Sequence, residues 1–179
     1  MPDQGEKIRP QYETHGVAGF YERFGAMYSN PHEAQIKMLL ERLIPEWNLD
    51  LSSVLDLACG SGEVSAVILK CGGTVTGVDP FTFEAYRNRT GLEAEQFSFE
   101  DIGDGALEGR QFSLIVCSFA LHLSEVSRLP TVAFQLAQIA DTLLILTPHK
   151  RPNLKAEWGW KLKAEMIEAR VRARLYSKV

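Results

Sequence analysis

Residues 54–62 of this 179-residue chain read VLDLACGSG, and this stretch decides the fold. An apolar run passes into a turn with two glycines, and an apolar-periodic segment follows directly. Glycine lets a backbone turn sharply and approach a ligand closely, while the N-terminus of a helix favours electronegative groups. The stretch therefore predicts a strand, a ligand-binding loop and a helix in succession.

The same alternation continues on both sides of this stretch. Continuous apolar runs, typical of strands buried on both faces, occur at 53–58, 74–78, 96–99, 112–117 and 142–147. Helices are predicted between them at 62–71, 82–90 and 129–140, with 100–111 mostly loop. An amphipathic helix with Ile36, Leu39, Leu40 and Leu43 on one face precedes the first strand. The pattern predicts an α/β fold with a doubly wound, mostly parallel sheet.

The last 31 residues are predicted to form a helix and a strand. Asn153 suits the start of a helix running to about Ala169, and residues 171–179 alternate apolar and charged side chains as an edge strand does. A continued basic helix is the alternative. The length favours a single domain over 1–179, with a lid and helix at 12–45, a core at 53–148 and a C-terminal helix and strand at 149–179.

Composition narrows the class of protein. With 45% hydrophobic and 23% charged residues the chain is globular, and its apolar runs fall far short of the roughly 20 residues that span a bilayer. The polar N-terminus lacks a signal-peptide core, so we expect a cytoplasmic or nuclear protein. Three cysteines within or beside apolar runs indicate reduced packing thiols, and their spacing predicts no metal site.

Charge is distributed unevenly along the chain. The net charge is −4, yet residues 149–179 hold nine Lys and Arg against three Glu, so this segment is +6 and the rest is −10. Two explanations fit this imbalance: the basic segment binds a nucleic acid, or it is a basic face that is merely solvated. HKR at 149–151 follows the fifth predicted strand, where it would rim a pocket and draw an anionic acceptor.

The glycine loop differs from a dinucleotide site. Ser65 occupies the third glycine position of the GxGxxG fingerprint. Asp56, inside the strand, suits an amino-bearing or cationic ligand better than a diphosphate. A nicotinamide-dependent oxidoreductase is therefore a distant alternative.

Four motifs in order carry a family resemblance. DLACGSG at 56–62, TGVDP at 76–80, FEDI at 99–102 and FSLIVCSFALHL at 112–123 resemble the motifs of class I S-adenosylmethionine-dependent methyltransferases. Ala58 and Ser113 depart from the usual glycine and aspartate. The resemblance implies strand order 3-2-1-4-5 with an additional C-terminal edge strand, S-adenosyl-L-methionine as donor and S-adenosyl-L-homocysteine as product. Because the family has two further strands after the fifth, either the sheet is trimmed or the chain is shortened.

The resemblance also implies roles for single residues. Asp79 would accept both ribose hydroxyls, and Asp101 would meet the adenine amino group. The cofactor-binding residues are expected to be Asp56, Ala58, Cys59, Gly60, Gly62, Asp79, Pro80, Asp101, Ile102, Cys117, Ser118 and Tyr28.

Aromatic residues and histidines are the candidates for the acceptor side. The segment from Tyr12 to Tyr28 resembles the lid of small methyltransferases, and we expect it to be mobile without ligand. Tyr21, His122 and His149 are the catalytic candidates, since both histidines follow strands at the sheet edge where α/β proteins bind ligands. An ordinary imidazole pKa near 6.5 would let either accept a proton, although each also suits a packing role.

A small-molecule acceptor is the preferred reading, as in quinone-biosynthesis methyltransferases. Motifs for cytosine carbon and for amide or exocyclic nitrogen methylation are absent. The alternatives are a tRNA- or RNA-modifying methyltransferase, and a methyltransferase-like binding module or partner-dependent subunit.

Overall fold

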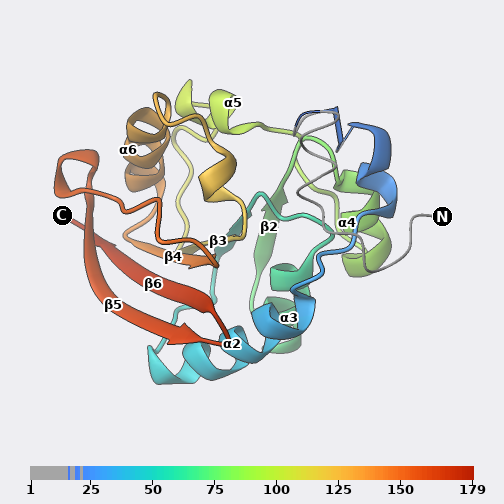
Figure 1. Ribbon diagram of the computed structural model, residues 1–179, viewed down its shortest axis with the longest axis horizontal. Coiled ribbons are helices and arrows are strands. Elements are labelled where there is room, and N and C mark those ends of the chain that lie inside the picture. The colour runs from blue at the N-terminus through green and yellow to red at the C-terminus, as the bar shows by residue number, and fades with distance from the viewer. Residues whose placement is uncertain (1–15, 17–18, 21) are drawn as a thin grey trace.

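A six-stranded sheet forms the centre of the molecule, whose computed structural model describes residues 16, 19–20 and 22–179. The strands follow the order β2-β1-β3-β4-β6-β5, with β1 to β4 parallel and β6 antiparallel to both of its neighbours. Figure 1 shows this sheet with helices around it. The strands are β1 Val54–Leu57, β2 Val75–Val78, β3 Leu114–Ser118, β4 Thr142–Thr147, β5 Trp160–Glu168 and β6 Val171–Lys178.

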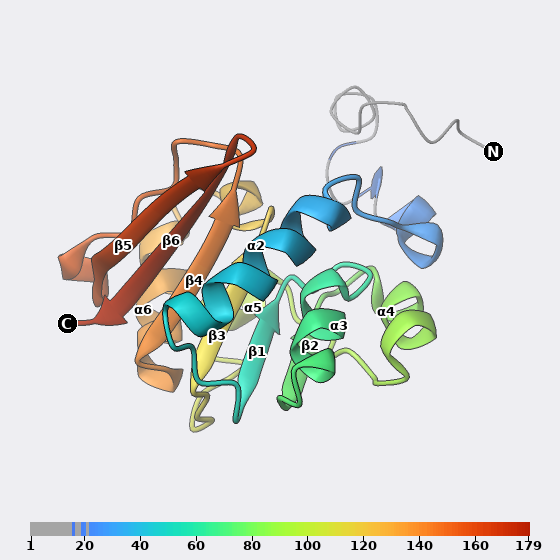
Figure 2. The same ribbon diagram turned by 90° about the horizontal axis from the view of Figure 1, so that it is seen from below.

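Helices cover both faces of the parallel strands. Figure 2 shows α2 and α3 in front of the sheet, and α6 behind it. The helices are α2 Glu33–Glu46, α3 Glu63–Lys70, α4 Phe83–Thr90, α5 Phe99–Gly103 and α6 Leu129–Ile139, with single 3₁₀ turns at η1 Gly25–Met27, η2 Leu121–Leu123 and η3 Ala156–Trp158. Within the described residues, no helix combines the length and apolar character needed to cross a membrane.

Two hydrophobic cores explain why the strand sequences are continuously apolar. Alternate residues of each strand face opposite layers. One core joins α2 and α3 to residues such as Val54 and Val116, and the other joins α5 and α6 to residues such as Leu55 and Ile115. The predicted apolar face of the first long helix is fully buried. Four of the five predicted strands and all three predicted crossover helices form within two residues of their expected bounds.

The strand predicted at 96–99, and with it the order 3-2-1-4-5, is wrong in detail. Only Glu95 pairs with Val78, as an isolated parallel bridge. Ser98 then begins a helix, since its hydroxyl accepts a hydrogen bond from the Asp101 amide and the Asp101 carboxylate accepts one from the Ser98 amide. This capping box ends the extended backbone. The segment 100–111, predicted as mostly loop, therefore starts inside α5.

The predicted C-terminal strand at 171–179 is confirmed as β6, but the helix predicted before it and its edge position are wrong. Residues after Lys155 form η3 and then β5, while β6 lies between β4 and β5 rather than at the edge. Ala169 and Arg170 both have positive φ, 47° and 66°, which makes the tight turn between the two strands. Tertiary pairing overrides the helical periodicity, because β6 bonds a strand on each side. The hairpin supplies the two further strands after β4, so the sheet is not trimmed on its C-terminal side.

Candidate functional site

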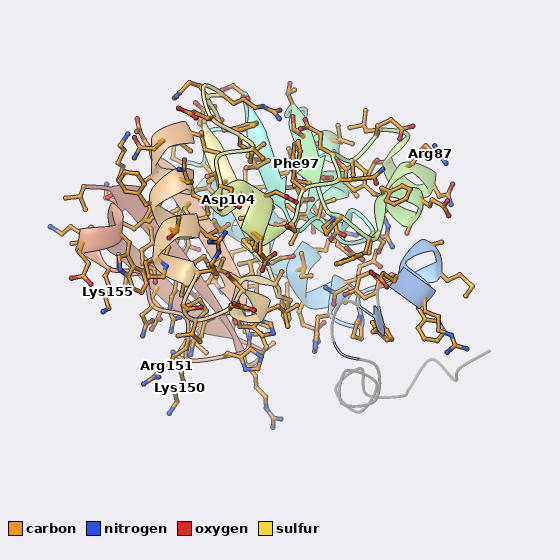
Figure 3. All side chains as sticks on the ribbon, turned by 90° about the horizontal axis from the view of Figure 1, so that it is seen from above. Arg87, Phe97, Asp104, Lys150, Arg151 and Lys155 are labelled. Atoms are coloured by element: carbon orange, nitrogen blue, oxygen red, sulfur yellow. The ribbon has the colours of Figure 1, made fainter. Side chains whose placement is uncertain are left out.

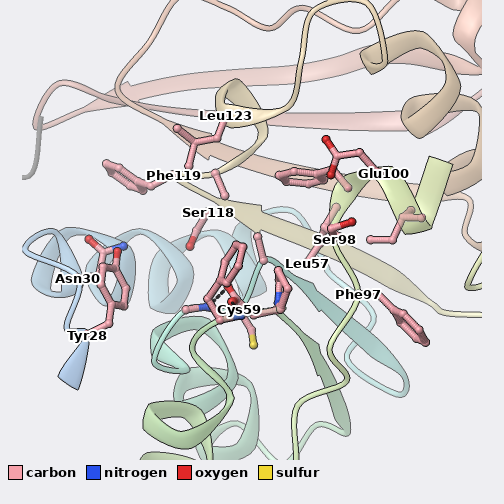
Figure 4. A pocket seen from close by; sticks show the side chains of 18 of the residues that line it. Tyr28, Asn30, Leu57, Cys59, Phe97, Ser98, Glu100, Ser118, Phe119 and Leu123 are labelled. Carbon is pink, nitrogen blue, oxygen red and sulfur yellow. Dashed lines mark hydrogen bonds between the residues drawn. The ribbon is translucent and has the colours of Figure 1, made fainter. Parts of the chain in front are cut away.

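A cavity of about 350 Å³ opens at the carboxyl ends of β1, β2 and β3. Figure 4 shows side chains from the segment before α2, the glycine loop and the ends of β2 and β3 converging on it. The expected cofactor residues that line it are Tyr28, Ala58, Cys59, Gly60, Asp79, Pro80, Ile102 and Ser118. Ligands bind at this edge in open α/β sheets.

The glycine loop after β1 is held from the end of β2. Gly60 has a φ of 56°, which glycine adopts without strain. Its amide donates to Oδ2 of Asp79 at 3.3 Å, while Oδ1 accepts from the amides of Phe81 and Thr82 at 2.9 and 3.0 Å. Burial raises the pKa of Asp79, and these hydrogen bonds oppose the rise. Asp79 therefore fixes the loop as well as facing the cavity.

The segment before α2 closes one side of the loop. A Cβ on Gly60 would lie 3.2 Å from the Tyr28 ring and 3.3 Å from Oε2 of Glu63, so the loop has room for no side chain. The Asn30 amide donates to Oε1 of Glu63 at 3.1 Å. Of the lid candidates, Tyr12 and the catalytic candidate Tyr21 lie outside the described residues.

Asp56 lies beneath the loop and is not among the residues that line the cavity, and the residue is only 1% exposed. Its Oδ2 accepts hydrogen bonds from the Ser65 amide at 3.0 Å and the Ser65 hydroxyl at 2.6 Å, and that hydroxyl lies 2.9 Å from the phenol oxygen of Tyr86. Oδ1 is buried without a partner in the described part of the chain. Burial, above all, raises the pKa of Asp56 to about 8. Asp56 therefore supports the loop from inside, and its role in cofactor binding stays a prediction.

Three other expected cofactor residues also lie outside the cavity lining. The exposed Asp101 carboxylate bonds back to Ser98, at 2.8 Å to both its amide and its hydroxyl. Gly62 precedes α3, and a Cβ there would lie 2.8 Å from Thr90. Cys117 is fully buried, and burial raises the pKa of its thiol to about 12. Burial likewise raises the pKa of Cys59, so neither thiol suits a nucleophilic role.

The two candidate histidines meet each other, outside the cavity lining. The ring centroids of His122 and His149 are 4.3 Å apart, with the planes tilted by 56°. Partial removal of water around His122, together with the neighbouring His149, lowers the pKa of His122 to about 4. His122 is therefore neutral at pH 7 and a weaker base than an ordinary histidine. Leu123, next to it on η2, does line the cavity.

Twelve residues that line the cavity were not among the predicted site residues. They are Asn30, Leu57, Glu63, Phe81, Phe97, Ser98, Phe99, Glu100, Phe119, Ala120, Leu123 and Glu125. For Phe81 and Phe119, which follow β2 and β3, the position after a strand was the available signal. Phe119 has a positive φ of 55° and its ring stacks on His32 at 4.7 Å. Strained backbone of this kind is frequent at binding sites.

The charge of the lining is one-sided. Every charged side chain among the described lining residues is acidic, namely Glu63, Asp79, Glu100 and Glu125. Such a cavity favours a cationic or neutral ligand. In the described part of the chain, no cluster of three or more His, Cys, Asp or Glu is arranged to hold a metal.

Comparisons with known sequences agree with this geometry. A family profile described as a methyltransferase domain matches residues 54–141, which run from β1 to the residue before β4. An uncharacterized protein of Schizosaccharomyces pombe is 35% identical in an alignment 196 positions long, which covers 86% of this chain and 79% of that protein.

Solved structures share the fold at low sequence identity. Magnesium protoporphyrin IX methyltransferase from Synechocystis PCC 6803, solved with bound SAM, is 16% identical with a TM-score of 0.64, covering 100% of this chain and 99% of that one. The PH0226 protein from Pyrococcus horikoshii OT3 is 15% identical with a TM-score of 0.66, covering 98% and 100%. The likeness in fold to these two structures therefore extends over nearly the whole chain.

Proposed function

This protein belongs to the class I S-adenosylmethionine-dependent methyltransferase family, and we propose that it methylates a small molecule held in the cavity at the carboxyl edge of the sheet. S-adenosyl-L-methionine is its donor and S-adenosyl-L-homocysteine its product. The donor supplies an electrophilic methyl group on a good leaving group. What remains for the protein is to align the two reactants and exclude water.

The placement of the lining residues supports a donor site on the glycine loop. Asp79 is the proposed acceptor for the ribose hydroxyls, because its carboxylate lines the cavity directly beside Gly60. Phe97, Phe99 and Ile102 offer apolar surface where an adenine ring would lie. Both hydrogen bonds from Ser98 to the Asp101 carboxylate end on Oδ2, so Oδ1 is the oxygen proposed to accept from the adenine amino group.

One observation carries the proposal of a small acceptor. The cavity continues from the glycine loop to an apolar wall of Phe119, Ala120 and Leu123, which offers surface for a small acceptor beside the donor site. Its acidic lining favours a neutral or cationic acceptor, which argues against the anionic acceptor expected from residues 149–151. Figure 3 shows Lys150 and Arg151 at the surface, well separated from Phe97 of the cavity. Catalytic roles for His122 and His149 remain proposals.

Transfer of labelled methyl groups tests the proposal. Purified protein is incubated with donor labelled in the methyl group and, separately, with small-molecule, RNA and protein fractions of a cell extract. We expect label in the small-molecule fraction without any added partner. Label in RNA, released by ribonuclease, would favour the RNA-modifying alternative, and donor binding without turnover would favour a partner-dependent subunit.

A double variant provides the matched control. Lys150→Ala with Arg151→Ala removes two exposed cations outside the cavity lining, so transfer to a small acceptor stays unchanged. If RNA is the acceptor, the double variant flattens the salt dependence of RNA binding, since each lost phosphate contact reduces the log-log slope by roughly one unit. The two outcomes separate the small-molecule and RNA proposals.

A further inference from the structure

Glu63 is a buried acid that the expected site did not include. Glu63 is the first residue of α3, is only 5% exposed, and lines the cavity. Oε1 accepts hydrogen bonds from the Asn30 amide and the Ser61 hydroxyl. Oε2 has no hydrogen-bond partner among the described residues. Unlike Oδ1 of Asp56, Oε2 is not fully buried, and Glu63 lines the cavity. One oxygen is thus used structurally and the other is open.

The charge of Glu63 is not neutralised by an ion pair in the described part of the chain. Arg89 contributes a favourable field, but its guanidinium is bound to the Glu33 carboxylate at 2.5 and 3.1 Å. The acids nearby, Asp56 and Asp79, offer no positive charge to offset it. A buried carboxylate in such surroundings gains most from a cation that also donates hydrogen bonds.

The position of Oε2 indicates which cation this is. Oε2 borders the glycine loop, since a Cβ on Gly60 would lie 3.3 Å from it and 3.2 Å from the Tyr28 ring. The sulfonium must present its methyl group toward the acceptor wall, and it has no N–H to donate. An α-ammonium group has three N–H donors. We propose that Oε2 of Glu63 receives the α-ammonium group of the donor, which makes Glu63 a specificity-determining residue for the amino-acid part.

Glu63→Gln separates this role from a purely structural one. The amide keeps the side-chain shape and keeps Oε1 as an acceptor for Asn30 and Ser61, so the tether to the segment before α2 remains. At the position of Oε2 it presents an NH₂ group, which cannot accept a hydrogen bond from an ammonium. Glu84→Gln is the matched control, because Glu84 is an exposed acid in the first turn of α4.

The experiment is calorimetric binding of three ligands to each protein. The inference rests on the proposed donor site, and the ligands are S-adenosylmethionine, S-adenosylhomocysteine and 5′-methylthioadenosine, which lacks the amino-acid part. We expect Glu63→Gln to bind the first two roughly 10- to 100-fold more weakly, as for a charge-assisted hydrogen bond, and to bind the third as wild type does. Glu84→Gln should match wild type for all three.

Other patterns overturn the inference in distinguishable ways. A loss for S-adenosylmethionine alone would assign Glu63 to the sulfonium, and an equal loss for all three ligands would leave Glu63 only a structural role. If wild type binds none of them, the donor site itself is misplaced and the inference fails with it. Should Glu63→Gln not fold, wild type is titrated with S-adenosylhomocysteine lacking its α-amino group, and undiminished affinity contradicts the proposal.

Discussion

Oδ2 of Asp79 lies 3.3 Å from the amide nitrogen of Gly60, so a carboxylate at the end of one strand restrains the glycine loop that follows its neighbour. The other oxygen of the same carboxylate accepts hydrogen bonds from the amides of Phe81 and Thr82, at the start of α4. One side chain thereby holds two backbone turns while facing the cavity. Ligand binding and local stability are coupled at this residue.

Asp79→Ala should therefore weaken both donor binding and folding. We expect S-adenosylhomocysteine to bind about 1 to 3 kcal/mol more weakly, because charge-assisted hydrogen bonds to the ribose hydroxyls are lost. The free energy of unfolding should also fall, since three amides lose their acceptor. Calorimetry and urea unfolding measure the two effects, with Glu84→Ala as the control. Wild-type affinity in a folded Asp79→Ala protein would remove Asp79 from the donor site.

Gly60→Ala is expected to reduce donor binding far more than Gly72→Ala does. Both glycines have positive φ, 56° and 79°, so the backbone strain of an added Cβ is similar. At Gly60 that Cβ meets the Tyr28 ring and the Glu63 carboxylate, whereas at Gly72 it meets nothing within 4 Å. Comparing thermal stability and S-adenosylhomocysteine affinity of the two variants isolates the steric effect. Equal affinities would show that the loop does not contact the donor.

Asp56→Asn should remove a pH dependence of stability. The folded-state pKa of Asp56, about 8, is above its ordinary value near 4, so folding takes up a proton between these pH values. The contribution of Asp56 to stability is full below pH 4 and falls as the pH rises toward 8. Urea unfolding of both proteins at pH 5, 7 and 9 measures this. The stability difference, wild type minus variant, should decrease between pH 5 and 7; a constant difference would contradict a protonated Asp56.

His149→Ala should raise the pKa of His122. Loss of the neighbouring imidazole removes one of the two causes that hold this pKa near 4, while burial, the larger cause, persists. We therefore expect a value above 4 and still below the ordinary 6.5. Imidazole resonances followed by nuclear magnetic resonance over a pH titration report it directly. A pKa that does not change would show that the ring contact exerts no electrostatic effect.

Several parts of the site were predictable because strand ends are local signals. Asp79, Pro80 and Ser118 each follow or end an apolar run, and the structure brings them to one edge. Glu63 also followed the glycine loop directly, yet no local pattern shows that one of its oxygens is tethered by Asn30, 33 residues away. The meeting of His122 and His149 likewise depends on β3 and β4 being neighbours.

The sequence by itself determined the parallel core. Continuous apolar runs and glycine turns are local signals of a few residues each, and they predict the same buried strands that the structure forms. Only the tertiary structure decided the C-terminal hairpin. Residues 160–168 fit a helix or a strand locally, and the hydrogen bonds that select the strand come from β6, which is itself held by β4. Burial of Trp160, whose indole donates to the Ala133 carbonyl at 2.8 Å, secures that choice. Such long-range contacts have no signature in the local pattern.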